Sequence, residues 1–132
     1  TIFDEYFKVG ASYDNIADSI KPRTKRLKIT ADSAEPRSID ELKKRGIYIV
    51  GARKGPDSVE HGIKWLQGLT QIVIDPVRCP NTAREFTGYE YERDKNGNFK
   101  SGYPDKNNHS IDMTRYAMES VITNRSWSGA AN

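Results

Sequence analysis

Short apolar runs alternate with segments of helical spacing along most of this chain. The runs cover residues 27–31, 47–50 and 71–74, and the last two are apolar enough to suggest strands buried on both faces. Between the runs, apolar residues recur at the spacing of amphipathic helices, which we expect to follow Ser12 and to start at Pro36. Since parallel strands need a helical crossover, this alternation predicts an α/β fold with parallel pairing among the middle strands.

The remaining segments complete this layout. Residues 1–7 read as a strand already under way, so we expect one domain over residues 1–132 that is N-terminally incomplete. Helices are expected after Asp57 or Ser58, over residues 82–87 and over residues 108–124. A β-hairpin is predicted near residues 89–100, turning at Asn96-Gly97 because both residues tolerate positive φ. Residues 125–132 are expected to form a flexible tail.

The composition and motifs of the chain argue against several classes of function. Cys79 is the only cysteine, which excludes an internal disulfide and a thiolate zinc site and fits a reducing cytosol. Residues 51–55 lack the spacing of a phosphate-binding loop, and no dinucleotide fingerprint is present, so ATP and nicotinamide cofactors are unsupported. No apolar run approaches the length of a membrane span, and we expect no membrane partner.

Three side chains are candidates for metal-dependent chemistry. Asp32 directly follows the strand expected at 27–31, and ligands of open α/β sheets gather at the carboxyl ends of strands. An Asp shortly before Pro36 is also a common turn former or helix cap. His109 and Asp112 lie one turn apart on the last helix, which Asn107 or Asn108 is expected to cap. Carboxylates and a histidine so placed suggest divalent-metal chemistry on a phosphate substrate, although two carboxylates are few for two ions.

Positive charge is concentrated in parts of the chain. The net charge is +3 and the sequence pI is about 9.0, which is compatible with nucleic-acid binding. Lysines and arginines cluster at 21–28 and 43–45, where they can equally be solvated helix ends. Arg53 and Lys54 follow the second expected strand and could hold a DNA backbone phosphate.

Three segments carry motifs that occur together in one known family. Residues 29–39 (ITADSAEPRSI) resemble the segment around the second catalytic aspartate of phage terminase large subunits. Residues 52–58 (ARKGPDS) resemble the loop that follows in this family, and residues 107–117 (NNHSIDMTRYA) resemble its closing motif, in which a His and an Asp three apart reach the active site. The order and intervals agree over nearly the whole chain.

The resemblance implies the C-terminal nuclease domain of a DNA-packaging motor, with an RNase H-like mixed sheet and flanking helices. Such a domain cuts concatemeric double-stranded viral DNA with Mn²⁺ or Mg²⁺, two ions in the complete domain. By analogy Asp32 and Asp112 would be metal ligands, and His109 would lie beside them. The portal protein and the small terminase subunit would be partners through the parent protein, in the host cytoplasm and outside the mature virion.

Alternatives to this reading remain open. The family's first aspartate lies upstream of the segment resembling residues 1–10, so the chain could be a catalytically inert module that binds DNA or docks on the portal. A junction-resolvase-like nuclease of the same superfamily is a second alternative. Asp4 or Glu5 could replace the first aspartate in part, although a structural role at the sheet edge suits both residues better.

Overall fold

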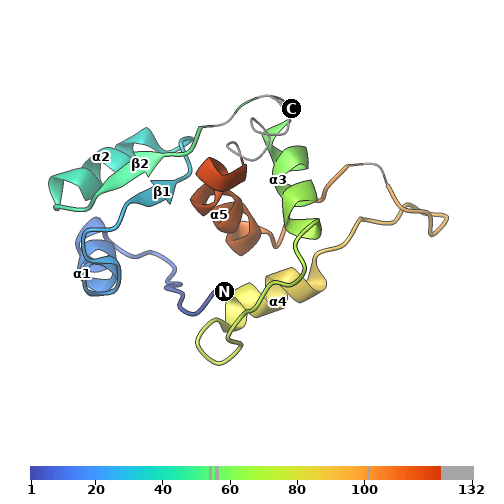
Figure 1. The fold of residues 1–132 in the computed structure, drawn as a ribbon, viewed down its shortest axis with the longest axis horizontal. Helices are drawn as coiled ribbons and strands as arrows, with labels where there is room; N and C mark the ends of the chain where they lie inside the picture. The colour runs from blue at the N-terminus through green and yellow to red at the C-terminus, as the bar shows by residue number, and fades with distance from the viewer. Residues whose placement is uncertain (54, 56, 101, 123–132) are drawn as a thin grey trace.

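A computed structural model describes residues 1–53, 55, 57–100 and 102–122 of the chain. Five helices and two strands occur among these residues (Figure 1): α1 Tyr13–Thr24, β1 Ile29–Ala31, α2 Pro36–Lys44, β2 Ile49–Gly51, α3 Ser58–Gln67, α4 Pro80–Gly88 and α5 His109–Ala117. The expected order of helices and strands is confirmed from α1 to α3. None of the helices in the described part of the chain is long and apolar enough to cross a membrane.

Strands β1 and β2 pair in parallel, with Ile29 opposite Ile49 and Ala31 opposite Gly51. Helix α2 makes the crossover between them, as the alternation of apolar runs predicts. Helices α1 and α2 pack together, and their apolar residues form one core with the strands. The buried members are Ala17, Ile39, Leu42, Ile47 and Ile49.

Local sequence signals explain where the first two helices begin. The hydroxyl of Ser12 accepts a hydrogen bond from the backbone N–H of Asn15 at 3.1 Å, which satisfies one of the free donors at the start of α1. Pro36 occupies the first turn of α2, where a missing N–H costs nothing. Helix α1 continues to Thr24 and contains Pro22 in its last turn.

The sheet is covered less completely than the apolar runs predict. Tyr48 is 56% exposed, although the run at 47–50 suggested burial on both faces. In the run at 71–74, Ile72 and Val73 are also exposed, so the prediction of a buried strand there is wrong. That run pairs with the N-terminal segment through a single parallel bridge between Ile74 and Ile2, and this short pairing leaves its side chains open to solvent.

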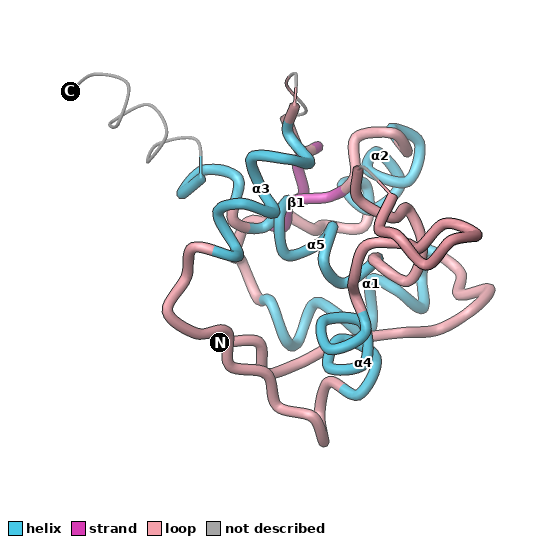
Figure 2. Tube along the Cα trace, turned by 90° about the vertical axis from the view of Figure 1, so that its right-hand side faces the viewer, coloured by secondary structure: helices cyan, strands magenta, loops and turns pink. Residues whose placement is uncertain are grey.

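Helices α3, α4 and α5 gather on the other side of the molecule from α1 and α2 (Figure 1), and strands make up only a small part of the fold (Figure 2). Helix α5 packs against both α4 and β1, so it joins the two sides. It ends at Ala117, and helical backbone resumes after Met118 over residues 119–122. The rest of the predicted helix to residue 124 and the predicted tail lie outside the described residues.

The predicted hairpin is present, with a different turn. Arg93 and Phe99 form an antiparallel bridge, and Lys100 N–H donates to the carbonyl of Glu92 at 2.7 Å. The turn spans residues 94–97 and is closed by a hydrogen bond from Gly97 N–H to the carbonyl of Asp94 at 3.1 Å. Gly97 has a φ of +81°, whereas Asn96 does not adopt positive φ, so only the glycine needs the left-handed region.

Candidate metal and DNA site

Asp32 lies where the sequence places it, directly after β1 at the carboxyl end of the parallel strands. Its side chain is exposed, and its Oδ1 accepts a hydrogen bond from the backbone N–H of Ala34 at 3.0 Å. This bond makes Asp32 a turn former, one of the roles expected from its position before Pro36. The side chain does not cap α2, whose N-cap residue is Glu35.

Asp112 lies in the first turn of α5, the helix that packs against β1. Its Oδ1 accepts a hydrogen bond from Arg115 Nη2 at 2.7 Å, one turn further along the same helix. The side chain of Asp112 is 28% exposed, and no described residue bonds its other oxygen, Oδ2. Asp112 therefore has a fixed orientation with one carboxylate oxygen still available.

Arg115 is the buried partner in this pair, with 6% of its side chain exposed. It packs against α3 at Gly62, where a Cβ atom would lie 2.6 Å from Arg115 Cδ. Its Nη1 donates to the carbonyl of Ser58 at 3.5 Å, and its guanidinium lies over the ring of Tyr116. Its Nε has no hydrogen-bond partner among the described residues, so a buried donor is left unsatisfied next to Asp112.

The start of α5 is fixed by α4 and not by its own sequence. The backbone N–H of Ser110 donates to Glu85 Oε2 at 2.6 Å, and the hydroxyls of Thr82 and Ser110 are 3.3 Å apart. Asn108 occupies the N-cap position, but its side chain makes no cap hydrogen bond and donates instead to Asp105. The predicted asparagine cap is therefore replaced by a carboxylate from a neighbouring helix.

The start of α4 is fixed in the same way by the N-terminal segment. The carboxylate of Glu5 accepts hydrogen bonds from the backbone N–H groups of Asn81 and Thr82, at 2.9 and 3.0 Å, and from the Thr82 hydroxyl at 2.8 Å. Burial by itself would raise the pKa of Glu5, but these hydrogen bonds outweigh it and lower the pKa. These contacts agree with the structural role that the sequence suggests for Glu5.

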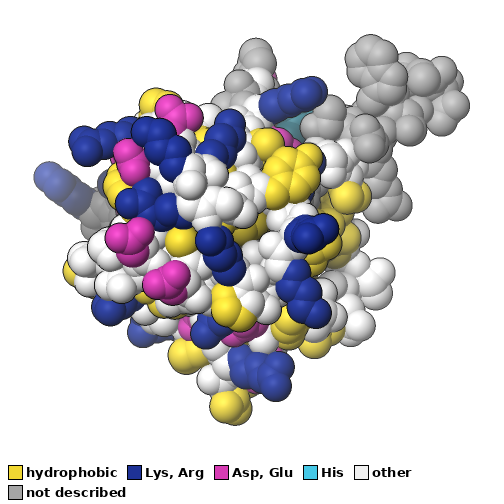
Figure 3. All heavy atoms as spheres, turned by 90° about the vertical axis from the view of Figure 1, so that its left-hand side faces the viewer, with side chains coloured by type: hydrophobic (Ala, Val, Ile, Leu, Met, Phe, Trp, Pro, Cys, Tyr) yellow, Lys and Arg dark blue, Asp and Glu magenta, His cyan; other side chains and the backbone are white. Residues whose placement is uncertain are grey.

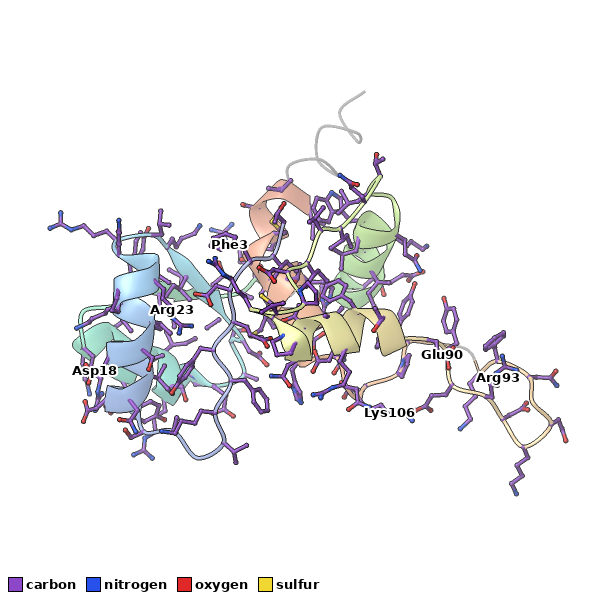
Figure 4. The ribbon with its side chains drawn as sticks, turned by 90° about the horizontal axis from the view of Figure 1, so that it is seen from below. Phe3, Asp18, Arg23, Glu90, Arg93 and Lys106 are labelled. Atoms are coloured by element: carbon purple, nitrogen blue, oxygen red, sulfur yellow. The ribbon has the colours of Figure 1, made fainter. Side chains whose placement is uncertain are left out.

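Asp4 is also engaged in a structural contact. Its Oδ1 lies 3.4 Å from Arg23 Nη1 on α1, and Figure 4 shows Arg23 on that helix beside the N-terminal segment that carries Phe3. The same arginine donates to the carbonyl of Glu5 at 3.1 Å. Glu5 therefore uses both of its carboxylate oxygens in structural contacts, whereas Asp4 is held through Oδ1.

The remaining predicted residues lie around this region. His109 is the first residue of α5 and is exposed, with no hydrogen bond of its side chain to the described residues. Arg53 is exposed just beyond β2, and its backbone N–H donates to Glu119 Oε2 at 2.7 Å, which ties the end of β2 to the chain after α5. Lys54 lies outside the described residues.

The described residues do not complete a metal centre. Among them there is no group of three or more His, Cys, Asp or Glu side chains that could hold an ion. Asp32 and Asp112 are carried by elements that pack together, but a third ligand does not join them. Sequence reasoning missed Arg115 and Glu85. The spacing of Asp112 and Arg115, three residues apart on a predicted helix, is a signal that could have identified the ion pair.

Comparisons with known proteins agree with this architecture. The family model described as the terminase RNAseH-like domain matches residues 1–120. The terminase large subunit of Bacillus phage SPP1 is 53% identical over 119 residues, which are 88% of this chain and 28% of that protein. The PBSX phage terminase large subunit of Bacillus subtilis (strain 168) is 36% identical over 98 residues, covering 73% of this chain and 22% of that protein.

A solved structure is similar over most of the fold. The crystal structure of the g2p (large terminase) nuclease domain from bacteriophage SPP1, with bound Mn, matches with a TM-score of 0.79 and 51% sequence identity. The match covers 89% of this chain and 68% of that chain, whereas this chain spans less than a third of the curated relatives. The expected RNase H-like α/β fold is confirmed. The chain belongs to the family of terminase RNase H-like domains.

Proposed function

We propose that this domain is a metal-dependent endonuclease that cuts concatemeric double-stranded viral DNA during headful genome packaging. The observation that supports the proposal is the packing of α5, the helix that carries Asp112, on β1, the strand followed by Asp32. The same fold at 51% identity bears Mn in the nuclease domain of SPP1. Mn²⁺ or Mg²⁺ is therefore the proposed cofactor.

The donor chemistry fits such an ion in part. Asp32 and Asp112 offer carboxylate oxygens, which are the ligands that Mg²⁺ and Mn²⁺ prefer. The described residues supply no third ligand near them, so the two carboxylates form an incomplete set. A divalent ion bound there would activate a water molecule and withdraw charge from the scissile phosphate.

The other site residues have distinct proposed roles. Arg115 holds Asp112 in one orientation, and Glu85 fixes the start of α5, whose first turn carries Asp112. His109, exposed at that helix end, lies beside the proposed site as an orienting or proton-carrying group. Arg53 lies just beyond β2, at the same edge of the sheet as Asp32, and we propose that Arg53, together with Lys54 next to it in the sequence, holds DNA backbone phosphates.

A second candidate function is a module that binds DNA or docks on the portal without cutting. The absence of a three-ligand group from the described residues favours it. In either case the portal protein and the small terminase subunit are proposed partners of the parent protein, which would act in the host cytoplasm.

Nicking of supercoiled plasmid in Mn²⁺ tests the main proposal. We expect metal-dependent nicking by the wild-type protein, and its loss in Asp32→Ala and in Asp112→Ala. Asp18→Ala is the matched control, because Asp18 is an exposed aspartate on α1 (Figure 4), a helix that carries neither of the two proposed ligands. Wild-type protein that binds DNA but does not nick it with any divalent metal would refute the endonuclease and favour the non-cutting module.

A further inference from the structure

All of the net positive charge of this chain comes from two short segments. Residues 21–28 and 43–48 contain eight of the 21 lysines and arginines and no acidic residue. The rest of the chain has 13 lysines and arginines against 18 aspartates and glutamates, so it is net negative. The overall charge of +3 therefore hides a strong separation of charge along the sequence.

The fold brings the two segments together. Helices α1 and α2 end at Thr24 and Lys44, and each is followed by a short loop into a parallel strand. Because parallel strands start at the same edge of a sheet, both loops lie at that edge. The backbone N–H of Ile29 donates to the carbonyl of Tyr48 at 2.8 Å. Lys21 Nζ would lie 3.5 Å from a Cβ atom placed on Gly46.

We call this surface the basic edge. It comprises Lys21, Arg23, Lys25, Arg26, Lys28, Lys43, Lys44 and Arg45. Figure 3 views this side of the molecule and shows Lys and Arg side chains spread across it, with fewer Asp and Glu side chains among them. The sheet separates the basic edge from Asp32, which follows the opposite end of β1.

Ion pairs within the fold account for only part of the basic edge. Arg45 is bound by Asp14 and Glu41, Lys44 approaches Glu41 at 3.8 Å, and Arg23 approaches Asp4. The other five cations are exposed and have no carboxylate partner among the described residues: Lys21, Lys25, Arg26, Lys28 and Lys43. Their charges are therefore available to an anionic partner.

The helix dipole explains some of these residues but not all of them. Lys21, Lys43 and Lys44 lie in the last turns of their helices, where a cation is favoured. Lys25 is the C-cap residue of α1, where a cation is favoured and a positive φ, here +53°, is a usual way for a helix to end. Arg26 and Lys28 lie beyond the cap, so the dipole gives no reason for them.

We propose that the basic edge binds the phosphate backbone of double-stranded DNA, as a contact separate from the proposed cutting site. The proposal rests on the proposed function in taking DNA as the ligand. Five of the eight cations are lysines, a residue type depleted in protein–protein interfaces but well suited to phosphate contacts. Because the basic edge and Asp32 lie at opposite ends of the strands, these contacts hold DNA and do not touch the scissile phosphate.

Duplex binding in metal-free buffer with chelator tests the proposal without requiring cleavage. The probe is a fluorescent duplex of mixed sequence, and its affinity is measured by anisotropy over a series of salt concentrations. The variant Lys25→Ala/Arg26→Ala/Lys28→Ala removes three exposed charges of the loop after α1. The matched control, Lys64→Ala/Arg78→Ala/Arg84→Ala, removes the same charge from exposed positions on α3, α4 and the loop between them.

Each lost phosphate contact should make the slope of log K against log salt shallower by about 0.9. We therefore expect the basic-edge variant to lose about 2 to 3 units of slope and about tenfold or more in affinity at moderate salt, while the control keeps the wild-type slope. Lys43→Ala/Lys44→Ala, from the other helix end, should give a smaller change in the same direction. Unchanged circular dichroism melting shows that the variants are folded.

Equal slopes for the basic-edge variant and the control would overturn the proposal, as would a wild-type protein that does not bind the duplex. Labelled polyglutamate that binds the basic edge more tightly than the duplex would also overturn it, in favour of an acidic protein partner. Plasmid nicking reports separately on the proposed function. If the protein nicks DNA but its duplex binding is unchanged in the basic-edge variant, only this inference is refuted. If it binds the duplex through the basic edge but never nicks it, only the proposed endonuclease activity is refuted.

Discussion

Asp112 Oδ1 and Arg115 Nη2 lie 2.7 Å apart on neighbouring turns of α5, with the arginine buried and the aspartate partly open to solvent. The pair joins the proposed metal ligand to the core, because Arg115 also packs on α3 at Gly62. Asp112 lies in the first turn of α5, where the helix dipole also favours a carboxylate.

We predict that Arg115→Met destabilises the fold, because it removes the hydrogen-bond partner of Asp112. We expect a loss of about 2 kcal/mol in the free energy of unfolding, below the cost of breaking a fully buried pair because Asp112 is partly solvated. Urea unfolding measures it. In the double variant Arg115→Met/Asp112→Asn, part of the loss should be recovered, since no lone carboxylate remains. Strictly additive effects of the two substitutions would show that the pair is not coupled.

Gly62→Ala should disturb the same arginine without changing any charge. The added Cβ would lie 2.6 Å from Arg115 Cδ and 3.1 Å from its Cγ, so the guanidinium must shift. We expect destabilisation of about 1–3 kcal/mol despite the better helix propensity of alanine. Gly68→Ala is the control, since a Cβ at that end of α3 meets only ordinary contacts at a φ of −78°. Equal thermal stabilities of the two variants would contradict the close packing on Gly62.

Glu5→Gln should lower stability at neutral pH and have less effect in acid. The folded-state pKa of Glu5 is lowered, so the carboxylate contributes stability above its unfolded pKa, and this contribution is lost as the pH falls through the folded pKa. We expect a loss of about 1–2 kcal/mol at neutral pH, from weaker hydrogen bonds to the start of α4. Urea unfolding at neutral pH and below pH 4 gives the comparison. If the difference in unfolding free energy between wild type and variant does not depend on pH, Glu5 does not cap α4 as an ionised carboxylate.

Glu85→Ala removes the carboxylate that caps α5 and should affect the site through the position of Asp112. A lost cap costs about 1 kcal/mol of stability, which thermal unfolding detects. Nicking should fall more than in Glu90→Ala, which removes an exposed carboxylate just after α4 that caps no helix. Normal nicking in a destabilised Glu85→Ala protein would show that the start of α5 need not be fixed for the chemistry.

Much of the fold is readable in the sequence because it depends on neighbouring residues. The cap at Ser12, the first-turn Pro36 and the apolar spacing locate α1 and α2 without tertiary information. The place of Asp32 after a strand, and of His109 and Asp112 on one helix, follows from the same local patterns. The exposure of Ile72 and Val73 does not follow from local patterns, because an apolar run shows which residues could be buried but not which part of the fold would cover them.

Local patterns are enough to predict the α/β alternation, the helix that carries Asp112 and the strand that Asp32 follows. The caps of α4 and α5 depend on packing between distant segments, because Glu5 caps α4 from 76 residues away and Glu85 caps α5 from 25 residues away. The pairing of the two strands also brings two separate basic segments to one edge of the sheet. The physical reason is range: propensity and capping act within a few residues, whereas these contacts depend on how distant elements pack.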